Sequence, residues 1–434
     1  MSLEIVALVA IILLFLLFTI GVPVAFSMAL VGFIGFAYVV DMHSALRLVA
    51  IDTCETFASY GLTVVPLFIL MGQVAFNSGI AKRLFDAAYK YIGHVPGGLA
   101  MATVVGATAF KAICGSSPAT AATFSLVAVP EMDRYGYSKK LSTGIVSCVG
   151  TLGVMLPPSV TLIIFGIITD QSIGRLFLAG ICPGLLISAF FVVVIYGWCK
   201  IDPTVGPKGE RTSWSGRLHA LPEVIWVGII FCLMIGGILK GFFTPTEAGS
   251  VGTILVLILT FIQRDMNVKG YIKSVKEASR TAVMVLVLIC GSTMLGHFIA
   301  VTKIPMIAAD WIVSLPFHSA IIIFFIVLIY LIGGSFIDDL AFMILATPIF
   351  FPAISKLGYN PLWFGIMICI TVMIGVVIPP VAMNVFVVKQ ITKVPFGVIY
   401  AGVYPFLISL VLGGIAVFLF PGLATWLPGW LMPG

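Results

Sequence analysis

The chain has 434 residues, of which 61% are hydrophobic and 9% are charged. This composition excludes a soluble globular protein and indicates a membrane protein that crosses the bilayer several times. The net charge of +6 at pH 7 does not indicate nucleic-acid binding, because the basic residues lie in short loops between apolar segments. Eight scattered cysteines, without a CxxC pair, argue against a metal centre or a disulfide framework.

Ten apolar segments are each long enough to cross a bilayer, which requires about 20 residues. They lie at about 3–20, 22–40, 59–78, 141–169, 176–199, 222–240, 245–263, 280–300, 361–391 and 396–421. The first follows Met1-Ser2-Leu3-Glu4 without a basic region or a small-residue cleavage site. We therefore interpret it as a retained span and not as a signal peptide.

Two further apolar segments, about 96–130 and 318–352, are too long for one crossing and are interrupted by polar residues. The interruptions are Gly115–Ala122 (GSSPATAA) and Gly333–Ala341 (GGSFIDDLA). Lipid cannot satisfy free amide and carbonyl groups, so such backbone must be buried in protein or line a cavity. We assign both segments as re-entrant helical hairpins. Two full crossings for each segment stay open as the alternative.

A double proline follows each hairpin inside the next apolar segment. The two pairs are Pro157-Pro158 and Pro379-Pro380, and they lie 222 positions apart. Proline removes a helical hydrogen bond and frees a carbonyl one turn earlier. Both segments are therefore predicted to be broken helices, with free carbonyls around 150–153 and 371–375.

The distribution of basic residues predicts the orientation of the chain. Under this assignment 17 Lys and Arg residues fall on one side and five on the other, and Lys111 lies within the first hairpin. By the positive-inside rule the richer side is cytoplasmic, so both termini face the periplasm. The first hairpin then enters from the cytoplasm and the second from outside, as an inverted repeat requires.

The repeat extends to the segments before the hairpins. Gly21–Val24 aligns with Phe243–Thr246, and Gly72–Ile80 with Gly296–Ile304. Each repeat then continues into a segment expected to lie along the membrane surface, Ala81–Ile92 in the first repeat and Pro305–Leu315 in the second. Each segment is either an arm that braces a mobile part of the protein or a plain interfacial helix. We divide the chain into first-repeat scaffold and arm (1–95), first transport part (96–175), connecting helix and cytoplasmic linker (176–221), second scaffold and arm (222–317), second transport part (318–395) and C-terminal helix (396–434).

The polar interruptions offer two kinds of ligand groups. Ser117-Pro118 has the pattern of an N-cap followed by proline at the first helical position, and Cys114-Gly115 is expected to end the incoming half-helix. In the second hairpin, Ser335 and Asp338 have capping-box spacing. Half-helix ends of this kind present carbonyls and hydroxyls to a small cation, and free amides to a carboxylate.

Structural interpretations compete with the functional ones for individual residues. Gly and Ser at helix crossings also serve close packing. An intramembrane carboxylate such as Asp338 is costly and usually functional, yet it could simply cap a helix. For Lys111 we favour snorkelling toward the membrane surface over contact with a substrate carboxylate. The five histidines show no ligand spacing.

The chain resembles, over essentially its full length, the large membrane subunit of the tripartite ATP-independent periplasmic (TRAP) transporters. The resemblance rests on Gly115–Ala121, on Gly150–Gly153 leading to Pro157-Pro158-Ser159, on Phe243–Gly249 (FTPTEAG), and on Asp338 with Ala341. Lys111 and the doubled Asp338-Asp339 depart from the family pattern.

The resemblance implies sodium-driven uptake of a small organic acid, such as sialic acid or a C4-dicarboxylate. It implies delivery by a periplasmic substrate-binding protein, a small membrane subunit, an inner-membrane location and an elevator motion of hairpins and broken helices. Because no extra helices precede Met1-Ser2, we expect that small subunit to be a separate chain. The predicted fold is an all-α polytopic membrane protein with about ten transmembrane helices and two re-entrant hairpins.

Two sodium positions are predicted where each hairpin tip meets its own broken helix, because neutral carbonyls and hydroxyls suit Na⁺. The predicted sodium ligands are Ser116, Ser117, Gly150, Thr151 and Gly153 in the first repeat, and Gly334, Ser335, Thr371 and Gly375 in the second. The predicted substrate contacts are Ser117, Pro118, Thr120, Pro157, Pro158, Asp338, Pro379 and Pro380.

Two alternatives to this function stay open. A sodium/dicarboxylate symporter of related architecture would work without a binding protein. An intramembrane hydrolase would use Ser116 or Ser117 as nucleophile, but no base can be placed beside either serine except Lys111. An ATP-driven pump is disfavoured, since the chain contains no GxxxxGK[ST] loop.

Overall fold

A computed structural model describes residues 3–432, apart from the side chains of Glu4 and Asp339. Within this range all regular secondary structure is helical, which confirms the predicted all-α class. The α-helices are α1 (Leu3–Thr19), α2 (Val24–Val39), α3 (Met42–Ala58), α4 (Val64–Asn77), α5 (Ile80–Ile92), α6 (Gly98–Lys111), α7 (Ser117–Arg134), α8 (Lys139–Thr151), α9 (Val160–Ile168), α10 (Ile173–Ile201), α11 (Trp214–Leu239), α12 (Pro245–Ile262), α13 (Val268–Val301), α14 (Ile304–Ser314), α15 (Ser319–Phe336), α16 (Asp339–Lys356), α17 (Pro361–Gly375), α18 (Met383–Thr392), α19 (Phe396–Leu419) and α20 (Gly422–Leu431). Two 3₁₀-helices, η1 (Gly61–Thr63) and η2 (Leu152–Val154), precede α4 and follow α8.

Several helices have the length and composition of membrane spans. Six helices in the described chain qualify singly, and the bent pair of α3 and α4 with η1 would make a seventh. Six further helices (α1, α2, α6, α14, α16 and α17) are apolar but shorter. Large hydrophobic side chains such as Leu8, Phe26 and Leu412 are exposed on the outer surface, as expected for contact with lipid. The protein is therefore a multi-pass membrane protein, and the number of ten spans stays a prediction.

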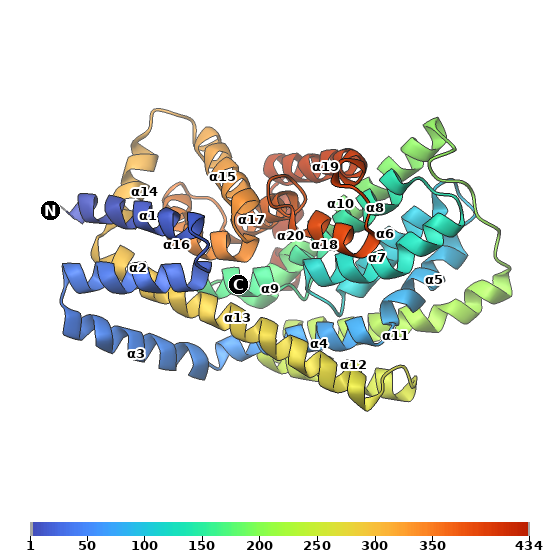
Figure 1. Cartoon of the computed structure of the whole chain (residues 1–434), viewed down its shortest axis with the longest axis horizontal. Coiled ribbons are helices and arrows are strands. Elements are labelled where there is room, and N and C mark those ends of the chain that lie inside the picture. The colour runs from blue at the N-terminus through green and yellow to red at the C-terminus, as the bar shows by residue number, and fades with distance from the viewer. Residues whose placement is uncertain (1–2, 433–434) are drawn as a thin grey trace.

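The long helix α13 connects the scaffold helices to one another. Figure 1 shows α13 running from the group of α1, α2 and α3 toward α4 and α12, and it packs against α2, α3 and α4. Small residues permit this close crossing. A Cβ atom on Gly32 of α2 would lie 2.6 Å from the backbone nitrogen of Leu295 in α13.

Both predicted helix breaks are confirmed. The helix α8 ends at Thr151, passes through η2 and a cis Pro157-Pro158 bond, and resumes as α9. In the second repeat α17 ends at Gly375, and α18 begins after a cis Pro379-Pro380 bond. Each preceding apolar segment is likewise split into two helices, α6 with α7 and α15 with α16. Their re-entrant course through a membrane stays a prediction.

Three boundaries differ from the sequence prediction. Residues 41–58 lie between two predicted spans, 22–40 and 59–78, but most of them form α3, capped by Asp41. The helix α13 begins at Val268, so a basic stretch expected in a cytoplasmic loop is helical. The C-terminal segment contains an additional helix, α20, which packs against α10. Amphipathic composition explains the first two differences, since such helices give no continuous apolar signal.

The linker between the repeats is shorter than predicted and is attached to the first repeat. The predicted linker covered residues 200–221, whereas the observed one covers 202–213, because α10 and α11 extend into the predicted range. Gly97 N donates to the Gly206 carbonyl oxygen at 3.0 Å, and Ser138 N donates to that of Val205 at 2.9 Å. These bonds connect the linker to the chain before α6 and before α8.

Candidate functional site

The first hairpin tip is the turn between α6 and α7. Ser116 caps α7, because its Oγ accepts a hydrogen bond from Ala119 N at 3.3 Å. The predicted cap was Ser117, which instead lies in the first turn beside Pro118. The prediction was wrong by one position because two adjacent serines have the same capping chemistry.

Lys111 ends α6 and points into the protein. Its side chain is 0% exposed, so the predicted snorkelling is wrong. The ammonium donates to the Ser116 carbonyl oxygen at 2.9 Å and to Thr120 Oγ1. A Cβ atom on Gly153 of η2 would collide with Lys111 Nζ, so the lysine side chain would have to shift to admit one.

Asn384 in α18 joins the second repeat to the first hairpin. Its Nδ2 donates to Ser117 Oγ and to the Ser147 carbonyl oxygen, both at 3.0 Å. A Cβ atom on Gly150 would lie 2.8 Å from the same nitrogen. Sequence reasoning missed Asn384; the available signal was an amide shortly after Pro379-Pro380 in an apolar segment.

The second hairpin tip has a different capping arrangement from the predicted one. Asp338 is the N-cap of α16, with Oδ1 accepting from Ala341 N at 3.2 Å. Ser335 lies inside α15, and its Oγ donates to the Leu331 carbonyl oxygen, so the predicted capping box is absent. The two prolines inside α16 do not disturb this cap, since it lies at the opposite end of the helix.

The second tip also meets its own broken helix. A Cβ atom on Gly375 would lie 3.2 Å from the carbonyl carbon and oxygen of Gly334. Val381 N donates to the Ser335 carbonyl oxygen at 3.2 Å. The hydroxyl of Thr371 donates to the Ile368 carbonyl oxygen, as that of Thr151 donates to Cys148 in the first repeat.

A cavity of about 520 Å³ lies between the scaffold helices and both hairpin tips. Its lining comes from α4, α13, the two tips, η2, α9 and α18: Phe68, Ile69, Gly72, Gln73, Phe76, Gly115, Ser116, Ser117, Pro118, Ala119, Ala122, Val154, Val160, Thr161, Glu277, Arg280, Thr281, Met284, Val285, Asp338, Leu340, Met383 and Val387. Among the predicted substrate contacts, this lining includes Ser117, Pro118 and Asp338. Thr120 and the four prolines are not in it.

Four helices direct their N-termini toward this cavity. Residues of the first turn or cap of α7, α9, α16 and α18 are all in the lining, for example Ser117, Val160, Asp338 and Met383. The free amides and the dipole of a helix N-terminus favour negative charge. The Asp338 carboxylate already caps α16, so the N-termini of α7, α9 and α18 are the ends that favour an anion in this cavity.

Arg280 adds a full positive charge to the cavity wall. It was predicted to lie at the cytoplasmic start of the span 280–300, but it lies within α13 and lines the cavity beside Glu277. Arg280 is exposed, and the ion pairs formed by described residues do not include it. Glu277 is engaged elsewhere, accepting from Asn77 Nδ2 at 3.2 Å. The Arg280 guanidinium is thus available to a ligand carboxylate.

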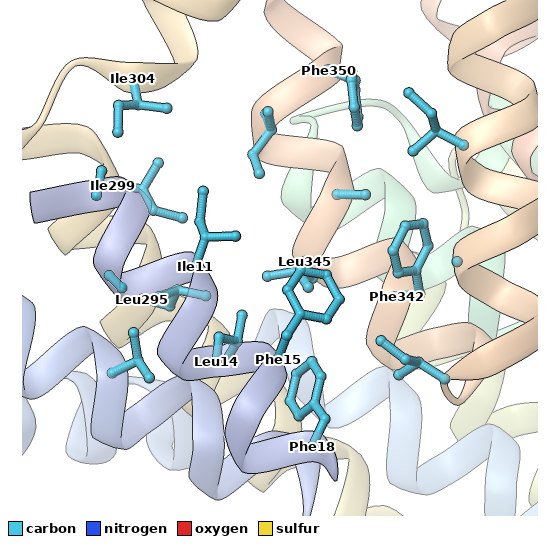
Figure 2. Close-up of a pocket in the computed structure, with 18 of the residues that line it drawn as sticks. Ile11, Leu14, Phe15, Phe18, Leu295, Ile299, Ile304, Phe342, Leu345 and Phe350 are labelled. Carbon is cyan, nitrogen blue, oxygen red and sulfur yellow. The ribbon is translucent and has the colours of Figure 1, made fainter. Parts of the chain in front are cut away.

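A second cavity, of about 670 Å³, is unsuited to an acid. Figure 2 shows its apolar lining, which includes Phe15 and Phe18 of α1, Leu295 of α13, and Phe342 and Leu345 of α16. Apart from Thr19, the lining side chains are apolar or glycine. A carboxylate here would lose its hydration without gaining a hydrogen-bond partner.

The fold, the split helices and the polar central cavity define a membrane transporter. In overall structure the chain is similar to the YdaH transporter of Alcanivorax borkumensis, with a TM-score of 0.60, 13% identity, and coverage of 87% of this chain and 89% of that one. The family model described as "Tripartite ATP-independent periplasmic transporter, DctM component" matches residues 11–423, and the chain belongs to this family.

Individual relatives agree with that assignment. The C4-dicarboxylate TRAP transporter large permease protein DctM of Pseudomonas aeruginosa is 34% identical, covering 89% of this chain and 90% of the relative. The sialic acid TRAP transporter large permease protein SiaM of Vibrio cholerae is 31% identical, covering 94% and 95%. An isethionate TRAP transporter permease protein DctMQ of Oleidesulfovibrio alaskensis is 32% identical; 93% of this chain matches 63% of that protein. These relatives are named as transporter permeases, which confirms the prediction that the chain is not an enzyme.

Proposed function

We propose that this chain is the large membrane subunit of a sodium-coupled TRAP transporter that imports a small organic acid across the inner membrane. The carrying observation is the cavity beneath four helix N-termini with Arg280 in its wall. A carboxylate would accept a hydrogen bond from the Ser117 amide at the start of α7, where Pro118 has no N–H and Ala119 N is bonded to Ser116 Oγ. It would also accept from the guanidinium, which binds carboxylates in a bidentate manner. The names of the relatives, for C4-dicarboxylates, sialic acid and isethionate, support an anionic solute.

Sodium coupling is supported by the two hairpin tips. Each tip presents main-chain carbonyls and hydroxyls beside a broken helix, and each lies close to a glycine of that helix, Gly150 or Gly375. Neutral oxygens of this kind hold Na⁺ without binding it too tightly for release. The proposed sodium ligands at the second tip are those predicted from the sequence, Gly334, Ser335, Thr371 and Gly375, and occupancy of the first tip depends on Lys111.

The proposed motion is an elevator. The hairpins and broken helices, α6 to α9 and α15 to α18, would carry the solute past α2, α4 and α13. The cavity supports this division, because one wall comes from α4 and α13 and the other from the tips, α9 and α18. The division at residues 96–175 and 318–395 follows from the same argument.

A periplasmic binding protein and a small membrane subunit complete the proposed complex. The cavity provides one free guanidinium for capture, so weak direct capture of a dilute solute is expected. A binding protein docked on the periplasmic face would raise the local solute concentration. The longer DctMQ relative leaves open whether the small subunit is always a second chain; here we propose that it is.

Reconstituted uptake tests this function. Proteoliposomes would contain the chain and its small membrane subunit, with an inward sodium gradient and labelled succinate or sialic acid outside. We expect uptake of one acid to stay near background until the binding protein is added, and to vanish when potassium replaces sodium. Full uptake without the binding protein would establish the stand-alone symporter instead. Uptake independent of sodium would contradict the coupling.

A further inference from the structure

Lys111 is a buried cation without a counter-ion. Its side chain has no exposed surface, and no ion pair among the described residues includes it. The ammonium donates instead to two uncharged oxygens, the Ser116 carbonyl and Thr120 Oγ1. An ionisable side chain at membrane depth is costly, so we expect this one to have a function.

The two simple roles for Lys111 do not fit its position. A side chain that snorkels would place its ammonium at a surface, whereas this one is enclosed. A side chain that binds the solute would reach the central cavity, but Lys111 is absent from the lining that Ser116 and Ser117 share. The ammonium lies behind the tip, between the turn and the broken helix.

The surroundings of the ammonium are those of a small monovalent cation. Lys111 is the last residue of α6, where the helix dipole is negative and carbonyls lack helical partners. Gly153 approaches so closely that a Cβ atom there would displace the ammonium from its present position. Ser116 and Gly153 are two of the residues that the sequence assigned to the first sodium ion. The lysine therefore donates to one of the predicted sodium ligands, the Ser116 carbonyl oxygen, and lies beside another, Gly153.

The second repeat lacks this charge. The corresponding stretch before the second tip is Ile332-Gly333-Gly334-Ser335, which contains no ionisable side chain. Gly375 lies against the backbone of Gly334 there, and the ionisable residues that follow, Asp338 and Asp339, are acidic. The two pseudo-equivalent tips thus differ in charge, with a lysine at the first and carboxyl groups at the second.

We propose that the Lys111 ammonium replaces the sodium ion of the first repeat, so that this chain binds a single coupling sodium ion, at the second hairpin tip. The inference rests on the sodium coupling proposed above. Two cations at the same oxygens repel each other, so the ammonium excludes sodium from the first tip. Because Lys111 is covalently attached, it travels with the tip in both directions and consumes none of the sodium gradient.

Sodium binding at equilibrium tests this inference without a solute. The full chain would be purified with its small membrane subunit, and the number of sites per chain would be measured by scintillation proximity with ²²Na⁺. We expect one site in the wild type and two in Lys111→Ala, which empties the first tip. Lys140→Ala, which removes an exposed lysine of α8, is the matched control and should retain one site. Gly375→Val, which presses on Gly334, should abolish the wild-type site.

The outcomes separate this inference from the proposed function. Two sites in the wild type would overturn the role of Lys111, whether or not the alanine variant folds. One site in both wild type and Lys111→Ala would also overturn it. Saturable binding in none of the proteins would overturn the sodium coupling itself. Sodium retained by Gly375→Val would show that the single ion lies away from the second tip and would contradict the assignment.

Discussion

Arg280 and Glu277 of α13 line the same wall of the polar cavity, one turn apart. The Glu277 carboxylate accepts a hydrogen bond from Asn77, whereas Arg280 belongs to no ion pair among the described residues. A solute carboxylate could form an ion pair with the guanidinium. Hydrogen bonds to charged groups contribute about 1.5–3 kcal/mol to binding or stability. Arg280 is therefore the side chain on which solute affinity should depend most.

The corresponding experiment replaces Arg280 with glutamine. We expect Arg280→Gln to raise the solute concentration for half-maximal uptake about tenfold or more, equivalent to about 1.4 kcal/mol or more. The exposed Lys276, on the same helix but outside the cavity lining, provides the control Lys276→Gln, which should leave uptake unchanged. Sodium binding should be the same in both variants. If Arg280→Gln leaves the solute concentration for half-maximal uptake unchanged, Arg280 does not belong to the solute site.

Single residues were predictable where their role is local and not where it depends on distant contacts. The serines and Asp338 carry capping chemistry that a few neighbouring residues reveal, and the error at Ser116 was one position. Lys111, Asn384 and Arg280 acquire their roles from elements far away in the chain. Asn384 bonds Ser117 across 267 positions, and a sequence pattern holds no signal for such a pair.

Helix breaks were the most predictable elements. Pro157-Pro158 and Pro379-Pro380 stop a helix by removing donors, whatever surrounds them. By contrast, α3 contains Arg47, Asp52 and Glu55, so its sequence lacks an apolar run of spanning length. Its helix is stabilised by tertiary contacts, among them Asp52 Oδ1 with His297 Nε2 of α13 at 3.2 Å. Contacts of this kind cannot be predicted from the sequence of α3 alone.

Ion pairs between elements agree with the predicted sidedness. Arg83 of α5 pairs with Glu223 and Asp265, near segments assigned to the cytoplasmic side. Lys356 at the end of α16 pairs with Asp310 of α14 at 2.6 Å, both in segments assigned to the periplasmic side. The pairs show which segments meet, and the orientation itself rests on the positive-inside rule.

Thiol labelling tests that orientation. Single cysteines at Tyr135 and Lys356, both exposed, would be introduced into a background without the native cysteines, of which Cys54 and Cys232 are exposed. An impermeant maleimide should label position 356 in intact cells and position 135 only after the membrane is opened. Replacing Lys356 removes its ion pair with Asp310, which should lower the stability of the fold only slightly, since exposed ion pairs contribute about 0–1 kcal/mol to stability. Labelling of both positions from one face would remove the inverted repeat.

The molecule as a whole is packed unevenly around the second hairpin. The apolar cavity of Figure 2 separates α1 and α13 from α15 and α16, whereas small residues bring α2 and α13 into close contact. Well-packed interfaces resist displacement, and a cavity has fewer contacts to break. The boundary between the second hairpin and α1 is therefore the place where the proposed elevator can move with least loss of packing.

Filling this cavity should hinder the motion without damaging the fold. Ala10 of α1 lines the cavity, so Ala10→Phe would place a ring against α16; cavity-filling changes commonly stabilise a protein by about 0.5–2 kcal/mol. We expect uptake several-fold slower than wild type, an unfolding temperature at least as high, and unchanged ²²Na⁺ binding. Leu8→Phe, at a residue of the same helix that is 58% exposed, is the control and should transport normally. A wild-type rate in a correctly folded Ala10→Phe variant would mean that the second hairpin does not move against α1. The moving boundary would then have to lie along α4 and α13, at the wall of the polar cavity.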